Sequence, residues 1–256
     1  EKYYEASSSL YRFDNAKGDG LWYLLYRGII QQNMGNIKRA EFFYISLEEL
    51  SIKENNNKML GSAILYQGIL NRFRKNFKES ISKYKTSYKI FKSIGDKYCM
   101  GMALANCGIA FRMDGKYDQA IKHYKKAIEI FDLVGDNYRK ACVQGRLGTA
   151  YRQLKKYPVA IENYNKSMSI FKDCDKIREG YVLKELAATY QFMGEFKKSI
   201  YFFEQAREIF HSAGDESREA RVWFYLGTLY LIAGDLIKAK NCFNEAINLN
   251  VNDSFY

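Results

Sequence analysis

The feature of this sequence that most constrains its fold is a small residue that returns about every 40 positions. By subtraction its six occurrences lie 40, 40, 40, 39 and 40 residues apart, at Gly28, Gly68, Gly108, Gly148, Ala187 and Gly227. Twelve residues after each stands a second short residue, at Ala40, Ser80, Ala120, Ala160, Ser199 and Ala239. Four residues further on an aromatic follows, at Tyr44, Tyr84, Tyr124, Tyr164, Phe203 and Phe243. Spacing held over six units indicates a repeat architecture, in which each unit buries its apolar face against its neighbours.

The stretch from Gly148 to Phe171 shows what one unit encodes: a helix, a tight turn and a second helix. A glycine inside a helix costs about 1 kcal/mol relative to alanine, so its regular return needs a packing reason. Small residues such as Gly148 and Ala160 let two antiparallel helices approach closely, and an aromatic such as Tyr164 fills the space towards the next unit. The sequence therefore predicts an all-α solenoid of helix pairs.

This pattern resembles the tetratricopeptide repeat (TPR) family over nearly the whole chain. The family order of glycine, aromatic, alanine, aromatic and alanine is matched by Gly148, Tyr151, Ala160, Tyr164 and Ser167, and again by Gly227, Tyr230, Ala239, Phe243 and Ala246. The chain departs from the family in two ways: only Trp223 supplies the early tryptophan, and the terminal proline is absent. The unit of about 40 residues, longer than the usual 34 or so, is similar to the long-unit arrays of LGN-type adaptors, kinesin light chains and Rap/PlcR-type peptide sensors. The resemblance implies a TPR superhelical solenoid of six antiparallel helix pairs plus a leading half repeat.

The repeat spacing predicts that residues 1–256 form a single TPR array. A half repeat is expected at 1–14, because Tyr4 lies 40 residues before Tyr44. Full repeats are expected at about 21–54, 58–94, 97–134, 137–174, 176–213 and 216–250. The apolar start and the short tail VNDSFY lack the polar character of solenoid caps, so we expect the chain to be part of a larger protein. The alternative is a separate capping helix at the N-terminus.

Glycine and aspartate mark the predicted turns between repeats. Glycines at 95, 135 and 214 are expected to end helices in the left-handed conformation, and the aspartate after each is expected to cap the next helix. Inside repeats, Gly35, Gly115, Gly194 and Gly234 are expected to do the same. Pro158, the only proline, falls in the first turn of a second helix, where its missing N–H does no harm.

The net charge of +11, from 40 basic and 29 acidic residues, favours an acidic partner. Acidic peptides, RNA and anionic membranes all fit this charge, and a merely solvated basic face is the alternative. The five cysteines form no CxxC pair, the two histidines belong to no metal-binding motif, and no phosphate-binding loop is present. We therefore expect no cofactor, no metal site and no catalytic residues. The absence of a signal peptide and of an 18-residue apolar run predicts a cytoplasmic protein without a membrane span.

In a TPR array the first helix of each pair lines the concave groove, as the resemblance implies. Four residues after the repeat glycine the sequence places Arg72, Arg112 and Arg152 in register, and such guanidinium groups suit carboxylates or phosphates. The groove is expected to be polar and basic in its middle and aromatic at its ends. Its candidate residues are Tyr26, Tyr66, Arg72, Phe73, Asn106, Arg112, Arg146, Arg152, Gln153, Lys184, Phe192 and Tyr225.

Two alternatives apply to these residues. The arginines can instead pair with neighbouring Asp or Glu and shape the superhelix. Lys184 and Glu185 are adjacent on a helix and are expected to point apart, so they do not suggest a catalytic pair. Asn106 alone matches the carboxylate clamp of TPR domains that hold chaperone tails, so that activity is not expected.

The sequence thus predicts a protein- or peptide-binding TPR scaffold that is not an enzyme. Its basic groove is expected to recognise an acidic or extended peptide segment, as the interaction or sensor part of a larger protein. One alternative is a TPR array that binds RNA or single-stranded nucleic acid. Another is a regulatory domain that controls a linked protease, kinase or DNA-binding domain. The sequence leaves the oligomeric state open.

Overall fold

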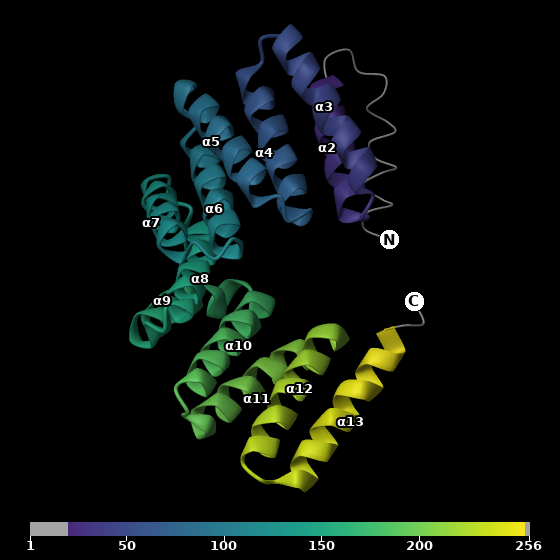
Figure 1. Ribbon diagram of the computed structural model, residues 1–256, viewed down its shortest axis with the longest axis vertical. Coiled ribbons are helices and arrows are strands. Elements are labelled where there is room, and N and C mark those ends of the chain that lie inside the picture. The colour runs from purple at the N-terminus through teal and green to yellow at the C-terminus, as the bar shows by residue number, and fades with distance from the viewer. Residues whose placement is uncertain (1–19, 254–256) are drawn as a thin grey trace. The chain divides into compact units, whose positions relative to one another are not determined.

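The computed structural model describes the backbone of residues 20–253 and the side chains of residues 20–249. Within the described residues the chain forms twelve α-helices joined by short turns, with no strand (Figure 1). The predicted all-α architecture of antiparallel helix pairs is confirmed. The half repeat predicted at 1–14 and the last three residues of the tail lie outside the described residues.

The helices alternate between first and second members of each pair. The first helices are α2 (Gly20–Asn33), α4 (Asn57–Phe73), α6 (Lys97–Met113), α8 (Asn137–Gln153), α10 (Lys176–Phe192) and α12 (Glu216–Ile232). The second helices are α3 (Ile37–Lys53), α5 (Phe77–Ser93), α7 (Tyr117–Leu133), α9 (Tyr157–Cys174), α11 (Phe196–Ser212) and α13 (Leu236–Asp253). The chain divides into two compact units, with unit 1 ending at Gly135 and unit 2 beginning at Asp136. The assignment of all residues to one continuous array stays a prediction.

Within each unit the pairs pack as the small and aromatic residues predict. In the α8–α9 pair, a Cβ on Gly148 would lie 2.8 Å from Cε1 of Tyr164 and 3.0 Å from the carbonyl oxygen of Ala160. Only hydrogen fits at this point, and the Tyr164 ring is fully buried against it. Close helix approach therefore accounts for glycine at this position of the α8–α9 pair in spite of its low helix propensity, and Ala187 is the small residue at the same position of α10.

Serine replaces alanine at several short positions without leaving a buried polar group unpaired. The hydroxyl of Ser80 donates to the carbonyl oxygen of Gly68 at 2.9 Å, and that of Ser199 donates to Ala187 at 2.8 Å. Both bonds cross from the second helix of a pair to the first. Because each buried hydroxyl has a partner, serine and alanine are both tolerated at this position of the repeat.

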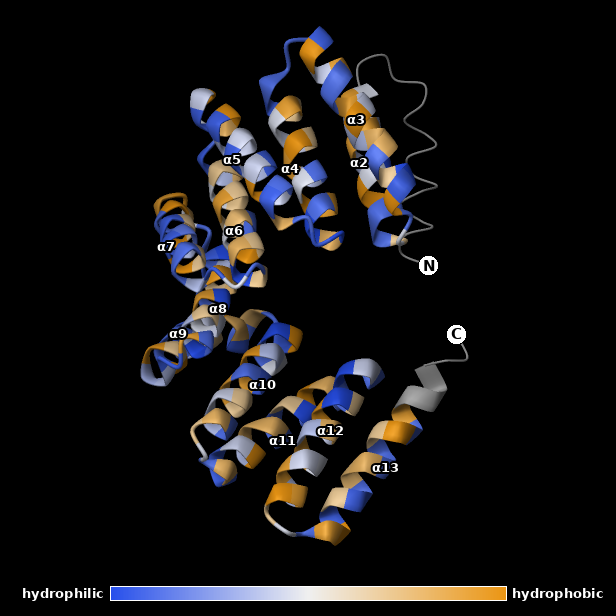
Figure 2. Cartoon of the chain, in the orientation of Figure 1, coloured by the Kyte–Doolittle hydropathy of each residue, from blue (hydrophilic) through white to orange (hydrophobic). Residues whose placement is uncertain are grey.

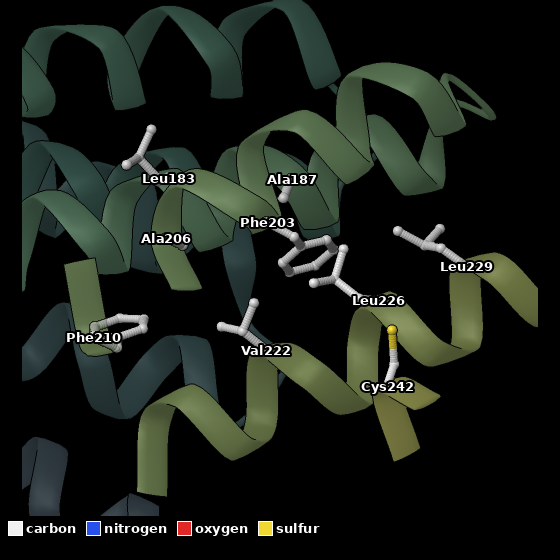
Figure 3. Close-up of a cluster of buried hydrophobic side chains, with 9 residues drawn as sticks. All are labelled: Leu183, Ala187, Phe203, Ala206, Phe210, Val222, Leu226, Leu229 and Cys242. Carbon is white, nitrogen blue, oxygen red and sulfur yellow. The ribbon is translucent and has the colours of Figure 1, made fainter. Parts of the chain in front are cut away.

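A hydrophobic core fills the space between successive helix pairs. In unit 1 a cluster from α2, α3 and α4 includes Tyr44, Leu47 and Leu70. In unit 2 a cluster from α10 to α13 is formed by Leu183, Ala187, Phe203, Ala206, Phe210, Val222, Leu226, Leu229 and Cys242 (Figure 3). Hydrophobic and hydrophilic residues are interspersed along the helices (Figure 2). Separation into an apolar and a polar face is clearest in second helices such as α7 and α11.

The predicted turn chemistry is confirmed. Gly95 has φ of +71° and Gly214 has φ of +65°, both in the left-handed region. The side chain of Asp96 accepts from the backbone N–H of Cys99, and that of Asp215 accepts from Arg218. These aspartates therefore cap α6 and α12 as expected.

The link between α9 and α10 differs and explains the single 39-residue interval. Here Asp175 is both the C-cap of α9 and the N-cap of α10. Its backbone is extended, with φ of −152° and ψ of 90°, and its side chain accepts from the N–H of Arg178. The left-handed residue present in links such as Gly95–Asp96 is missing, and a single residue replaces the three between α7 and α8. Because α9 is one residue longer than α7, the repeat as a whole is shorter by one residue.

Lys75 and Lys155 occupy the turn position that glycine holds in other repeats, with φ of 62° and 58°. A side chain in this region costs about 1–2 kcal/mol. We expect Lys75→Gly and Lys155→Gly each to raise the free energy of unfolding by about 0.5–1 kcal/mol, because glycine relieves the strain but loses more backbone entropy on folding. Urea unfolding followed by circular dichroism measures the change. The reverse substitution, Gly115→Lys, is the control and is expected to destabilise by a similar amount.

Candidate ligand-binding site

The first-helix face of unit 1 carries two arginines in register on α4 and α6. The Arg72 guanidinium lies 5.2 Å from the ring centroid of Phe73, and its Nε donates to the hydroxyl of the buried Tyr84 at 3.4 Å. Its Nη1 lies 4.0 Å from the sulfur of Met113, which follows Arg112 on α6. This contact joins α4 to α6, so Arg72 and the end of α6 share one surface.

Neither Arg72 nor Arg112 forms an ion pair with a carboxylate in the part of the chain that the structure describes. The Nε of Arg112 is buried and has no hydrogen-bond acceptor among those residues. Phe73 beside Arg72 is 56% exposed. Unit 1 therefore presents two cationic groups next to exposed apolar surface, and no carboxylate of the described residues pairs with either of them.

The other predicted residues of unit 1 serve the scaffold to different degrees. Tyr66 stacks on Tyr44 with ring centroids 5.1 Å apart, and burial raises the pKa of Tyr66. The side-chain amide of Asn106 donates to the carbonyl oxygen of Met102 on its own helix at 3.0 Å. Tyr26 is exposed and stacks on Trp22 at 5.7 Å. Of these three, Tyr26 offers the most ring surface to a ligand.

In unit 2 the corresponding arginine is paired. Arg152 Nη2 lies 2.6 Å from Oε2 of Glu185, which links α8 to α10, and the Arg152 side chain is only 13% exposed. The expectation that Lys184 and Glu185 point apart is wrong, because Lys184 Nζ lies 3.0 Å from Glu185 Oε1. The long lysine side chain reaches back to its neighbour's carboxylate. Arg152 and Lys184 thus share the carboxylate of Glu185. This agrees with the alternative that the arginine pairs with a neighbouring acidic residue of the protein.

One exposed aromatic residue lies beside this charged cluster of unit 2, and the other predicted residues of the unit lie elsewhere on α8 and α12. The Arg152 guanidinium lies 5.7 Å from the ring centroid of Phe192, whose side chain is 65% exposed. Tyr225 on α12 stacks on the buried Phe203 at 5.3 Å and is exposed. Gln153 is exposed at the end of α8. Of the predicted residues in unit 2, Arg152, Lys184 and Phe192 are brought together around Glu185.

A cavity of about 150 Å³ is lined by residues of α8, α9 and α10. Arg146 and Arg178 line it, and Glu185 is at its edge. Arg178 Nε donates to the hydroxyl of Tyr138 at 2.7 Å, and that hydroxyl donates to Asp175 at 2.8 Å. Burial opposes the charge of Arg178, but these polar neighbours outweigh it and raise its pKa.

Sequence reasoning missed Arg178 as a residue of this cavity. A signal for it was present, because Arg178 stands 40 residues after Tyr138 and three after the capping Asp175. Arg178 is in register with Arg139 and Arg218, because each lies three residues after a capping aspartate and nine residues before the small residue of its repeat.

Burial disfavours the thiolate form of several cysteines. All five are free thiols. Burial raises the pKa of Cys99 and of Cys107 to about 12, and it also raises that of Cys142 in spite of the nearby Arg178. A thiol with a raised pKa is a poor nucleophile at neutral pH.

The described residues contain no group of three or more His, Cys, Asp or Glu side chains that could hold a metal ion. Over the same residues, no helix has both the length and the apolar character needed to cross a membrane.

Comparison with known families identifies the class of protein. The sequence model of the tetratricopeptide repeat matches residues 61–133, 113–173 and 178–250, which together make up more than half of the chain. The chain belongs to the tetratricopeptide repeat family. No curated protein matches it by sequence.

Solved structures with the same fold include proteins of several kinds. BtubC (BKLC) from P. vanneervenii is 19% identical with a TM-score of 0.72, covering 88% of this chain and 92% of its own. A signal transduction ATPase with numerous domains, which carries a tetratricopeptide repeat sensor, comes from Pyrococcus horikoshii; it is 18% identical with a TM-score of 0.75, covering 95% of this chain and 38% of its own. The apo form of RapI is 14% identical with a TM-score of 0.72, covering 99% of this chain and 91% of its own. At these identities the likeness shows the fold alone.

Proposed function

We propose that this chain is a protein- or peptide-binding scaffold whose first-helix faces recognise an acidic or extended peptide segment. The observation that carries the proposal is the state of Arg72 and Arg112. Both lie in register on adjacent helices, and neither has a carboxylate partner among the described residues. A partly buried guanidinium forms its strongest hydrogen bonds with an anionic acceptor. In this proposal a bound ligand supplies that acceptor.

The surroundings of these arginines favour a peptide over a simple anion. Phe73 and Met113 are exposed beside Arg72, so apolar contact is available next to the charge. An acidic peptide presents both carboxylates and apolar side chains along one segment. Arg152 has a different role in this proposal. Its ion pair with Glu185 holds α8 against α10, and its guanidinium packs beside the exposed ring of Phe192.

We further propose that the array acts as the sensor or interaction part of a longer protein, located in the cytoplasm. The solved structure of an ATPase that carries a tetratricopeptide repeat sensor supports the first part by analogy of fold. Five free thiols without a disulfide support the second, because thiols persist in a reducing compartment.

The test is a selection of 12-residue peptides from a random displayed library against the wild-type chain, followed by fluorescence anisotropy with the enriched peptides. We expect peptides rich in Asp and Glu. Arg72→Glu/Arg112→Glu is expected to weaken their binding by about 100-fold or more, because charge-assisted hydrogen bonds contribute about 1.5–3 kcal/mol each.

The matched control is Lys38→Glu/Lys78→Glu, which makes the same change in net charge at exposed positions of α3 and α5. This control is expected to bind within about threefold of wild type, because exposed charges at a distance are screened by salt. Equal weakening in both variants would contradict a specific site. Binding of single-stranded RNA with a steep salt dependence, in place of peptides, would favour the nucleic-acid alternative.

A further inference from the structure

A second groove lies between the second helices α5 and α7, with a volume of about 500 Å³. Its floor is formed by buried residues of α6, which include Leu104, Cys107 and Phe111. These residues recur every three or four positions and define one side of α6, whereas Asn106 lies about half a turn away on the first-helix face. The groove is therefore separate from the site proposed above.

Three lysines form the rim of this groove: Lys85 from α5, and Lys122 and Lys126 from α7. All three are exposed, and none makes an ion pair with any acidic side chain of the residues that the structure describes. The ammonium of Lys85 lies 5.8 Å from the ring centroid of Phe111 on the floor. Lys122 and Lys126 are one helical turn apart, so their ammonium groups project on the same side of α7.

His123 of α7 also lines the groove, and its pKa reflects the positive charge of the nearby lysines. Its ring lies 4.9 Å from that of Phe111, and its Nδ1 donates to the carbonyl oxygen of Gln119 at 2.8 Å. Burial lowers the pKa of His123, and the three rim lysines lower it further against the opposing effect of the Gln119 carbonyl. The imidazole is thus neutral at neutral pH, with Nε2 as a hydrogen-bond acceptor.

The corresponding place in unit 2 shows that repeat geometry alone does not create this groove. There Tyr190 and Phe202 occupy the repeat positions of Phe111 and His123, and their rings stack in parallel at 5.4 Å. The repeat positions of the three lysines hold Asn165, Tyr201 and Gln205. The place between α9 and α11 therefore lacks the three cations that surround the apolar floor between α5 and α7.

We propose that the groove between α5 and α7 binds an acidic amphipathic peptide segment of a partner protein. An apolar side chain of that segment rests on Leu104, Cys107 and Phe111, and flanking carboxylates meet the rim lysines. Charge complementarity supports this occupant, because the rim offers three cations and no anion. The volume is in the range of sites that take small ligands or a few side chains, about 300–1,000 Å³.

The experiment isolates this groove from the first-helix site. A random 12-residue peptide library is selected against the Arg72→Glu/Arg112→Glu variant, in which the first-helix site is disabled. Enriched peptides are expected to contain two or more acidic residues and an aromatic or aliphatic residue. Their affinity for the rim-lysine variant, Lys85→Glu/Lys122→Glu/Lys126→Glu, measured by fluorescence anisotropy, is expected to be at least about 100-fold lower.

The matched control is Lys78→Glu/Lys89→Glu/Lys125→Glu, which changes the net charge equally at exposed lysines of the same two helices outside the groove. It is expected to retain binding within about threefold, since these charges face solvent. Equal loss in both triple variants would overturn the proposal in favour of general electrostatic attraction. Failure to enrich any peptide, or enrichment of peptides without acidic residues, would also overturn it.

A spectroscopic readout locates the bound peptide. The chain has two histidines, so proton NMR resolves the ring signals of His123 and His211, with His211→Gln as the assignment variant. Addition of an enriched peptide is expected to shift the His123 signal and leave that of His211 in place. A shift of neither signal at saturation would place the peptide elsewhere and contradict the proposal.

Discussion

Tyr164→Ala is expected to lower the free energy of unfolding by about 3–5 kcal/mol. The side chain is fully buried in a cluster with Ala160, Val182 and Leu186, so its removal leaves a cavity that the rigid helix pair cannot close. Its hydroxyl also donates to Oγ1 of Thr149 at 3.2 Å, and that bond is lost. Urea denaturation followed by circular dichroism measures the effect.

The control for this substitution is Tyr201→Ala. Tyr201 is 58% exposed and lies on α11, where it contacts Phe202 and accepts a hydrogen bond from Gln205. Its replacement is expected to change the free energy of unfolding by less than about 1 kcal/mol. Similar losses for Tyr164→Ala and Tyr201→Ala would mean that the buried aromatic does not anchor the pair.

Gly148→Ala is expected to lower the free energy of unfolding by about 1–3 kcal/mol. The added Cβ would meet both the Tyr164 ring at 2.8 Å and the backbone oxygen of Ala160 at 3.0 Å, and backbone cannot move aside without separating α8 from α9. The clash exceeds the helix propensity that alanine adds, about 1 kcal/mol. The same urea denaturation measures it.

Gly145→Ala is a matched control on the same helix. A Cβ there meets only the Ser167 side chain, at 3.3 Å and beyond, so alanine is expected to be neutral or stabilising. The double variant Gly148→Ala/Tyr164→Ala provides a further check, because loss of the ring removes the main clash. A penalty for Gly148→Ala that is unchanged in the Tyr164→Ala background would show that the ring is not its cause.

The repeat could be predicted from sequence because the spacing of small and aromatic residues is itself the packing arrangement. The intervals between Gly148, Ala160 and Tyr164 are set by contacts within one helix pair, so they are visible along the chain. The turn glycines and aspartate caps are equally local. For these reasons the helix pairs and their caps followed from the sequence.

The ion pairs on the first-helix faces were harder to predict from the sequence. Arg72 and Arg152 hold the same repeat position. Among the residues whose side chains are described, only Arg152 of these two has a carboxylate partner, because Glu185 stands where the next repeat after Arg72 has Asn106. Register comparison therefore groups residues whose surroundings differ. Whether an arginine has a carboxylate partner depends on which residue of the next repeat faces it. The aligned repeats show this residue only once the packing of neighbouring first helices is known.

The groove between α5 and α7 had no sequence signal of its own. Its rim lysines look like the solvated lysines of the other second helices. They become a group only when α5 and α7 are placed on either side of α6, with the apolar floor between them. Tertiary arrangement, rather than residue type, distinguishes Lys85 from Lys89.

The short link at Asp175 bears on how such arrays change length. Asp175 ends α9 and begins α10 without the left-handed residue found at Gly95 or Gly214, yet the helix pairs on both sides keep their internal spacing. The links between repeats thus tolerate the loss of a residue, whereas the spacing of residues inside a helix pair stays constant. Recombination of repeats, in nature or by design, is therefore best tolerated when the crossover falls at these links.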